Sequence, residues 1–274
     1  MRMKKTTNSK QVLGLSYDIE TSPIISYNWN VWEQNAIEVI EDWQILSVAW
    51  HWIIDEPGKK TKLTKVEVVG QDDYENFVPG VNNDIEVVKK LASLIEQADY
   101  SIAHNGDRFD MKKLGARVAL HRLPPMTPGI QVDTKKMAKR VGGFTYNSLK
   151  ELSKAFGVTL KGQSGGFSTW TGCLAGDPGA WKKMKRYNVQ DIKPMTELYM
   201  ILRSYDKQNV PMNVLLGIPE ACPKCGTIDS MRERTKNKVT KTQSYMYYRC
   251  KIKSCGAISQ SRASVPTFNK MQYK

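Results

Sequence analysis

Four cysteines in two close pairs constrain the C-terminal part of this chain more tightly than any other feature. Two residues separate Cys222 from Cys225, four separate Cys250 from Cys255, and 24 lie between the pairs. Two turns joined by a hairpin can present four thiolates to one Zn²⁺ ion in a tetrahedron. Two disulfides are the alternative, which is disfavoured because nothing indicates secretion and cytosolic thiols stay reduced. A module of about 40 residues has too little core to fold alone, so we expect one structural zinc ion.

The distribution of charge places a boundary just before these cysteines. The 274 residues include 41 Lys and Arg against 27 Asp and Glu, a formal net charge of +14. From Pro219 onward there are 12 basic and 3 acidic residues, so the last 56 residues carry +9 and the rest +5. This excess indicates a polyanionic partner, with nucleic acid first among the candidates.

The composition divides the chain into five parts. We expect a basic N-terminal tail at 1–10, a main domain at 11–205, a Pro-, Asn- and Gly-containing linker at 206–219, a cysteine domain at 220–262 and a C-terminal tail at 263–274. The cysteine domain resembles a zinc ribbon. Arg232 and Arg234 fall between its cysteine pairs, with three tyrosines after them, and basic residues interleaved with aromatic ones suit nucleic-acid contact. A solvated loop, or a surface for a protein partner, are the alternatives.

The main domain shows apolar runs typical of strands and, further on, helical spacing. The expected strands are 12–19, 45–54, 63–69, 100–104 and 131–134, and the expected helices are 83–98, 109–121, 148–156 and 180–203. This order predicts an α/β fold, a mixed sheet with flanking helices. No apolar run approaches the roughly 20 residues of a membrane span. The basic N-terminal residues lead into a strand-like segment, so we expect a soluble cytoplasmic protein without membrane contact.

Acidic residues recur at the ends of these elements. Asp18 and Glu20 lie two apart at the end of the first strand, where side chains share a face. Asp110 follows Phe109 where a strand gives way to a helix, and Tyr187 precedes Asp191 by one helical turn. Each element alone is compatible with ordinary surface charge or helix capping.

Together, in this order and at these separations, the three elements resemble the exonuclease motifs of the DEDDy branch of the ribonuclease H-like superfamily. That branch includes ribonuclease D and the proofreading domains of family A and family B DNA polymerases. The resemblance covers about residues 11–205, and the likeness is strongest to free-standing exonucleases related to the family B domains. A sister branch has His in place of Tyr, five residues before the last Asp; His51, His104 and His121 all lie far upstream of that position.

The resemblance implies a ribonuclease H-like fold and a two-metal 3′–5′ exonuclease. Two divalent ions, Mg²⁺ or Mn²⁺, would be held by four carboxylates, and Tyr187 would orient or help to activate the attacking water. The implied ligands are Asp18, Glu20, Asp110 and Asp191. Phosphodiester hydrolysis needs an activated water and stabilised charge on both oxygens, which two hard cations held by carboxylates provide.

Other residues are weaker candidates for substrate contact. Asn105 is either a substrate contact or a turn former, and Lys161, in a Gly-rich loop, either meets phosphate or belongs to a solvated loop. We expect Trp29, Trp32 and Trp43 to cover the core, although aromatic faces can also stack on unpaired bases.

The sequence therefore predicts a 3′–5′ exonuclease acting on DNA or RNA, with single-stranded DNA or a 3′ end as the expected partner. A structure-specific endonuclease on the same fold and a non-catalytic nucleic-acid-binding protein are the alternatives.

Overall fold

The computed structural model describes residues 10–32, 35–160, 166–208 and 210–265, which form two compact units. The sheet unit comprises Leu13–Ile53 and Leu63–Tyr199, and the ribbon unit comprises Ile54–Lys62, the chain from Met200 onward and the N-terminal residues up to Val12. Among the described residues, no helix combines the length and apolar character that crossing a membrane requires.

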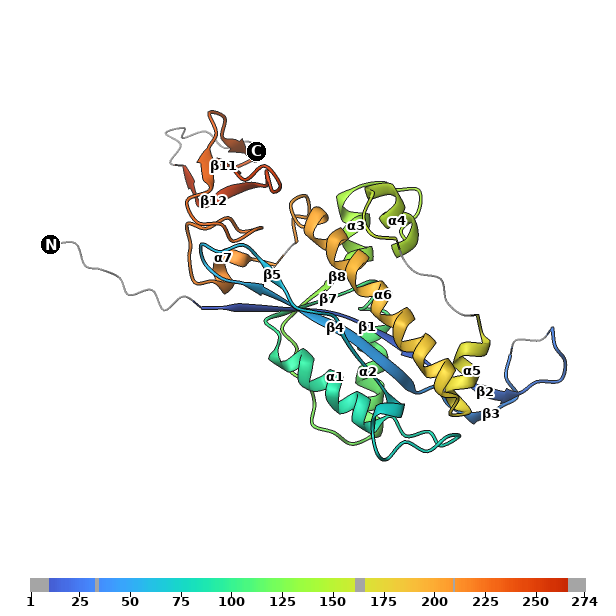
Figure 1. Ribbon diagram of the computed structural model, residues 1–274. Helices are drawn as coiled ribbons and strands as arrows, with labels where there is room; N and C mark the ends of the chain where they lie inside the picture. The colour runs from blue at the N-terminus through green and yellow to red at the C-terminus, as the bar shows by residue number, and fades with distance from the viewer. Residues whose placement is uncertain (1–9, 33–34, 161–165, 209, 266–274) are drawn as a thin grey trace. The chain divides into compact units, whose positions relative to one another are not determined.

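A mixed six-stranded sheet is the centre of the sheet unit (Figure 1). Its strands run in the order β5-β4-β1-β7-β8, with β6 paired to β4. Strand β1 pairs with β7 and β7 with β8 in parallel, whereas β4 and β6 are antiparallel. The bounds are β1 Val12–Thr21, β4 Ile45–Asp55, β5 Lys62–Leu63, β6 Glu67–Gly70, β7 Tyr100–Ala103 and β8 Ile130–Asp133. The predicted α/β class with a mixed sheet is confirmed.

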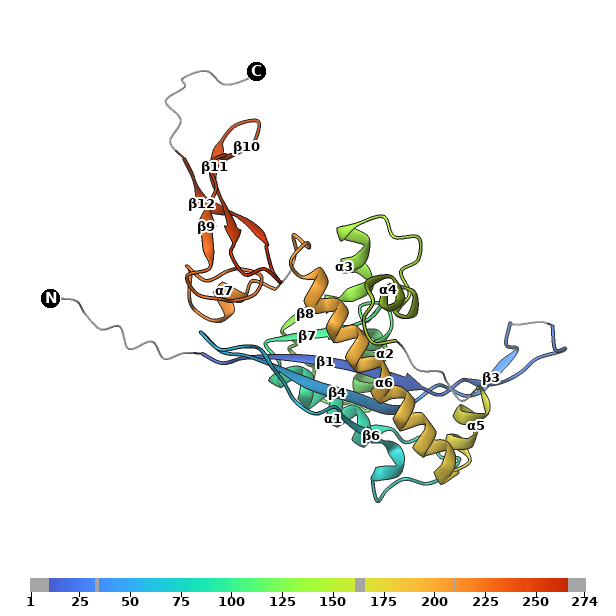
Figure 2. The same ribbon diagram turned by 45° about the horizontal axis from the view of Figure 1, so that its top comes forward.

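Helices cover both faces of this sheet (Figures 1 and 2). Leu15, Tyr17 and Ile19 of β1 pack with buried residues of α1 and α2 in the main core. On the other face, Ser16 of β1 accepts a hydrogen bond from Thr196 of α6 at 2.9 Å. The helices are α1 Ile85–Gln97, α2 Asp110–Leu120, α3 Thr134–Val141, α4 Leu149–Phe156, α5 Ser168–Leu174 and α6 Pro178–Leu202, with a 3₁₀ turn η1 at Gln71–Asp73.

The four predicted helices and four of the five predicted strands are confirmed, with ends shifted by a few residues. The strand expected at 63–69 is wrong as one element, because β5 ends at Leu63 and β6 begins at Glu67. Helices α3 and α5 and a hairpin of β2, Ile25–Tyr27, with β3, Glu38–Glu41, were not expected.

A small antiparallel sheet forms the cysteine-containing part of the ribbon unit. Strand β11 lies between β10 and β12, and β9 also pairs with β11. The bounds are β9 Met231–Glu233, β10 Lys238–Val239, β11 Ser244–Cys250 and β12 Ile258–Val265, and helix α7 spans Met212–Leu215.

The segment expected as a linker, 206–219, contains α7 and contacts the first cysteine turn. The Met212 N–H donates to the Pro223 carbonyl at 3.1 Å. Strand β12 continues to Val265, past the expected domain end at 262. The domain boundaries drawn from the sequence stay a prediction.

Candidate active site

Three acidic side chains of the sheet unit meet in one place. Asp18 and Glu20 of β1 and Asp191 of α6 each offer a carboxylate oxygen, and these oxygens all lie within 4.8 Å of one another. We call these three residues the carboxylate cluster. Asp191 is buried, while Asp18 and Glu20 are half-buried. Carboxylates this close repel each other unless a cation lies between them, and their oxygens are the ligands that Mg²⁺ and Mn²⁺ prefer.

Strand alternation explains why β1 contributes two members of the cluster. Successive side chains on a strand point to opposite faces. Tyr17 and Ile19 therefore fill the core against α1 and α2, and the residues between and after them face α6. On α6, Asp191 lies five positions before Thr196, whose hydroxyl bonds to Ser16 of β1. That contact fixes α6 along β1 beside the two acidic residues.

Asp110, the fourth expected ligand, lies next to this cluster but outside the group of three. It is buried at the start of α2, and its Oδ1 accepts a hydrogen bond at 3.3 Å from the Ile19 N–H, between Asp18 and Glu20. Burial, with the nearby charge of Asp133 as a smaller contribution, raises the pKa of Asp110 to about 7.

Tyr187 lies one helical turn before Asp191 on α6 and is half-buried. Its ring meets Trp170 of α5 edge to face, with centroids 6.0 Å apart and an interplanar angle of 69°. Such a contact restricts the ring and therefore the direction of its hydroxyl group. The sequence did not single out Trp170, because nothing in its neighbourhood indicates that α5 packs on this part of α6.

The junction between β7 and α2 is held by side chains from later elements. Asn105 has a positive φ of 70°, and its N–H donates to Asp133 Oδ1 at 3.0 Å. Its carbonyl accepts from Arg108 and Phe109, as expected for a turn former. Asp133 also caps α3, a role that an Asp just before a helical stretch could have indicated. Lys161 lies outside the described residues.

The four paired cysteines of the ribbon unit also meet in one place, the cysteine cluster. Their sulfur atoms all lie within 4.8 Å of one another, and all four thiols are free. Sγ of Cys222 lies 3.9 Å from that of Cys255, and Sγ of Cys225 lies 3.8 Å from that of Cys250. Thiolates about 2.3 Å from one zinc ion in a tetrahedron would be about 3.8 Å apart. The donor set therefore fits zinc, and the alternative of two disulfides does not match these separations.

Two similar turns bring the cysteines together despite their unequal spacing. The Cys222 N–H donates to the Thr227 carbonyl at 3.0 Å, and the Cys250 N–H donates to the Ala257 carbonyl at 2.9 Å. Gly226 and Gly256, directly after the second cysteine of each pair, have positive φ values of 72° and 56°. Glycine adopts this conformation without strain, so each chain can turn back at that point.

One face of the ribbon sheet is rich in guanidinium groups. Arg232 of β9 stands directly opposite Arg249 of β11. Both line a hollow of about 380 Å³ together with Arg234 and Lys251, and Glu233 is the one acidic residue in the lining. The Arg234 guanidinium also lies 5.6 Å from the centroid of the Tyr247 ring. Like charges directly opposite each other on a sheet are destabilising unless an anion lies between them. The sequence indicated Arg232 and Arg234 but missed Arg249, whose place opposite Arg232 depends on the strand register.

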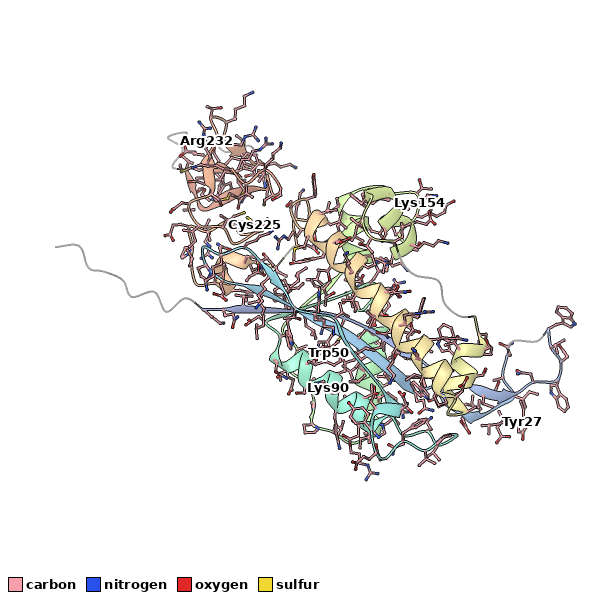
Figure 3. All side chains as sticks on the ribbon, viewed as in Figure 1. Tyr27, Trp50, Lys90, Lys154, Cys225 and Arg232 are labelled. Carbon is pink, nitrogen blue, oxygen red and sulfur yellow. The ribbon has the colours of Figure 1, made fainter. Side chains whose placement is uncertain are left out.

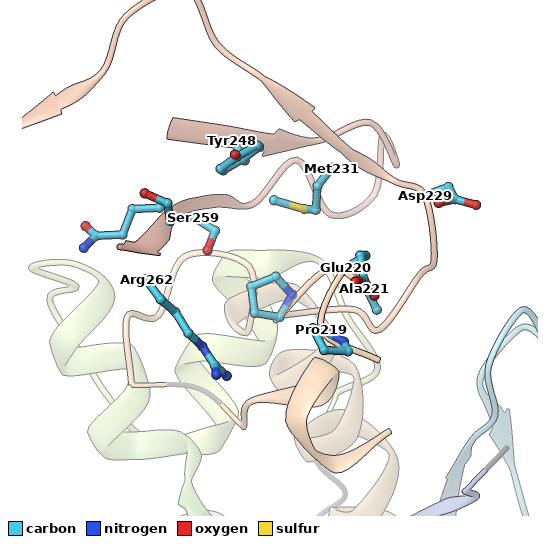
Figure 4. Close-up of a pocket in the computed structure, with 11 residues that line it drawn as sticks. Pro219, Glu220, Ala221, Asp229, Met231, Tyr248, Ser259 and Arg262 are labelled. Carbon is cyan, nitrogen blue, oxygen red and sulfur yellow. The ribbon is translucent and has the colours of Figure 1, made fainter. Parts of the chain in front are cut away.

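The other face of the same strands borders a second hollow, of about 460 Å³ (Figure 4). Met231 and Tyr248 supply apolar wall, and Glu220, Asp229 and Arg262 supply charge. Acidic residues outnumber the basic one in this lining, so the hollow is not suited to bind a polyanion such as nucleic acid.

The tryptophans after the first strand do not all cover the core. Trp43 packs against the main core, and the Lys113 ammonium lies 3.5 Å from its ring centroid. Trp29 and Trp32 are 84% and 88% exposed. The expectation is therefore confirmed for Trp43 and wrong for Trp29 and Trp32, which lie on the unexpected hairpin of β2 and β3.

Residues 58–203, more than half of the chain, match the family model described as the RNase_H superfamily, and the chain belongs to that superfamily. The matched span contains Asp110, Tyr187 and Asp191 but not Asp18 or Glu20. Membership indicates a nuclease, a hydrolase that acts on nucleic acid.

Among solved structures, the chain is similar to the family B DNA polymerase from the hyperthermophilic archaeon Pyrobaculum calidifontis. The identity is 12% and the TM-score 0.48, over 87% of this chain and 33% of that chain. The chain thus spans about a third of the length of that polymerase. No curated protein matches the sequence.

Proposed function

We propose that this protein is a divalent-metal-dependent 3′–5′ exonuclease that removes nucleotides from the end of a DNA or RNA strand. The observation that carries the proposal is the carboxylate cluster, with Tyr187 one helical turn before Asp191. The direction of degradation is supported by the order and residue types of the three acidic motifs.

The residues of the site divide the work among them. Asp18, Glu20 and Asp191, with Asp110 beside them, would hold two Mg²⁺ or Mn²⁺ ions. When bound, such ions supply an activated water and stabilise charge on the attacking and leaving oxygens. Tyr187 would orient the water through its hydroxyl group, with its ring held against Trp170.

The ribbon unit would hold the substrate strand. One zinc ion bound by Cys222, Cys225, Cys250 and Cys255 would stabilise its fold, and the guanidinium-rich face would contact phosphates. The role of Arg232 and Arg234 in substrate contact is supported by the hollow that they line together with Arg249. Asn105 and Lys161 stay candidates for substrate contact, and the hollow in Figure 4 is the candidate surface for a protein partner.

Cleavage of a panel of labelled substrates tests this function. Single-stranded DNA and RNA labelled at the 5′ end should shorten progressively from the 3′ end with Mg²⁺ or Mn²⁺, and a 3′-phosphorothioate block should slow the reaction. Circular single-stranded DNA should remain intact. Cleavage of the circle would identify an endonuclease, and binding without cleavage of any substrate would identify a non-catalytic nucleic-acid-binding protein.

A further inference from the structure

Many large apolar side chains of the hairpin of β2 and β3 are exposed to solvent. Tyr27, labelled in Figure 3, is one of them. Nine exposed large apolar side chains fall within residues 24–40, and Tyr27 is 62% exposed. The side chains of Trp29 and Trp32, in the loop that joins the two strands, are more exposed still. Exposed apolar patches of this kind mark binding surfaces on soluble proteins.

Two hydrogen bonds are formed within the described residues of this loop, 28–32 and 35–37. The Ile37 N–H donates to the Tyr27 carbonyl at 2.9 Å where the loop leaves the strands. The Trp32 N–H donates to Asn30 Oδ1, also at 2.9 Å, which forms a tight turn between the two indoles. These two bonds restrain the described backbone around the two rings, which lowers the entropy lost when they bind a partner.

The base of the hairpin is attached beside the carboxylate cluster. Only five positions separate Glu20 on β1 from Ile25 at the start of β2. The Ser22 N–H donates to the Gln44 carbonyl at 2.9 Å, and the Gln44 N–H donates to Ser22 Oγ at 3.0 Å. Figures 1 and 2 show β2 and β3 extending from the sheet beyond the end of β1. A strand whose end lies at the cluster would thus pass near the hairpin.

The charge of the hairpin indicates whether it contacts the phosphates or the bases of the nucleic-acid strand. Residues 22–44 contain no Lys or Arg, whereas Glu33, Glu38, Glu41 and Asp42 are acidic. These carboxylates repel phosphates, while indole faces stack on nucleobases whatever their identity. We propose that Trp29 and Trp32 stack on unpaired bases of the substrate strand. This inference rests on the proposed function and names two further substrate-binding residues for it.

Two double variants separate stacking from general apolar contact. In Trp29→Leu/Trp32→Leu the apolar character remains but the flat rings are lost, and Trp29→Phe/Trp32→Phe retains aromatic faces as the matched control. The probes are a fluorescent single-stranded DNA and the same strand with abasic sites near its 3′ end. Affinity is measured by anisotropy without added divalent metal, over a range of salt concentrations.

The leucine variant should bind the intact strand about tenfold or more weakly, and the phenylalanine variant should lose much less. Both should match the wild type on the abasic strand. The slope of log affinity against log salt should be unchanged, because no phosphate contact is removed.

If the leucine variant binds the intact strand as tightly as the wild type does, the hairpin proposal is overturned. A loss of self-association by that variant in sedimentation would then identify a second copy of this chain as the partner of the hairpin. An equal loss of affinity on the abasic strand would overturn the hairpin proposal as well. If the wild-type protein neither binds nor cleaves either strand, the proposed function fails and the hairpin proposal fails with it. Binding and cleavage that are both insensitive to the leucine substitutions leave the function standing and remove only the role of the hairpin.

Discussion

If the four clustered cysteines bind zinc as proposed, removal of the zinc should unfold the cysteine-containing part of the ribbon unit and leave the sheet unit folded. The buried cluster of this part consists of Cys222, Cys250 and Ala257. Cys225, Met231 and Cys255 pack around it and are only partly buried. The small core is therefore made largely of the expected zinc ligands.

The expected magnitude follows from this composition. Full burial of a Val or Leu side chain contributes about 1.5–3 kcal/mol, and Ala and Cys are smaller. A structural zinc site at pH 7 contributes about 10–16 kcal/mol of binding free energy, which appears as folding free energy. Met212 and Leu216 are also buried, beside Gly226 of the first cysteine turn. The metal contribution exceeds what these two side chains and the three small ones supply together, so β9–β12 should lose their structure without it.

Hydrogen exchange read by mass spectrometry measures this directly, with zinc content from elemental analysis. The wild-type protein should contain about one zinc ion per chain, and Cys225→Ser should contain none and exchange rapidly in β11. The matched control is Cys173→Ala, which changes the one cysteine outside the cluster, buried beside α6. It should retain zinc and protection in β11. Adding a chelator to the wild type should reproduce the Cys225→Ser pattern in β11 while the amides of β1 stay protected.

Slow exchange in β11 of the zinc-free protein would refute this reasoning, because apolar burial alone would then hold the ribbon sheet together. Equal zinc in the wild type and in Cys225→Ser would show that the four thiols are not the site.

Three further changes have defined outcomes. Tyr187→Phe should slow single-turnover hydrolysis by about 10- to 1,000-fold with little change in metal affinity; an unchanged rate would reduce Tyr187 to packing. Arg117→Leu removes the guanidinium that lies 2.6 Å from the fully buried Asp84, which keeps the His121 ring and the Ile45 N–H as partners. The loss of these charged hydrogen bonds should lower the free energy of unfolding by about 1.5–3 kcal/mol in urea titrations; a loss below about 0.5 kcal/mol would contradict this. Burial lowers the pKa of His51, so stability should fall as the pH drops below the usual histidine pKa of about 6.5, where the unfolded chain binds the extra proton. In thermal denaturation, the stability of His51→Gln should fall less steeply with decreasing pH than that of the wild type. An equal fall in both proteins would show that His51 does not cause it.

Periodicity in the sequence predicted the elements that are buried on one face. Helix α1 presents Val87, Val88 and Leu91 to the core, and the apolar run of β4 fills the centre of the sheet. In these elements the apolar residues of the pattern are the ones that face the core, so the pattern was sufficient to predict the element. The interruption between β5 and β6 was missed, because Leu63 and Val69 are apolar on both sides of it.

The same logic failed for the hairpin of β2 and β3. Trp29 and Trp32 were expected to cover the core because large aromatic side chains usually gain free energy by burial. Trp29 and Trp32 depart from that rule, and no pattern in one sequence distinguishes an exposed tryptophan from a buried one. Exposure in the folded chain was the observation needed.

Much of the candidate site could be predicted because its geometry is local. Asp18 and Glu20 share a face through strand alternation, and Tyr187 and Asp191 share one through the helical repeat. Contacts that depend on tertiary packing or strand register were out of reach. The contact of Trp170 with Tyr187 and the pairing of Arg249 with Arg232 are of this kind.

Hydrolysis of a 5′-labelled single strand as a function of Mg²⁺ concentration tests the central claim most directly. The comparison is between the wild type, Asp18→Asn, Asp191→Asn and the control Glu75→Gln, which changes an exposed residue of another Asp-x-Glu triplet. The wild type and the control should shorten the strand from its 3′ end at equal rates. The two Asn variants should be slower by about a hundredfold or more at every Mg²⁺ concentration, because each removes a proposed metal ligand. Rates within about tenfold of the wild type in either Asn variant would contradict the assignment of the carboxylate cluster as the catalytic metal site.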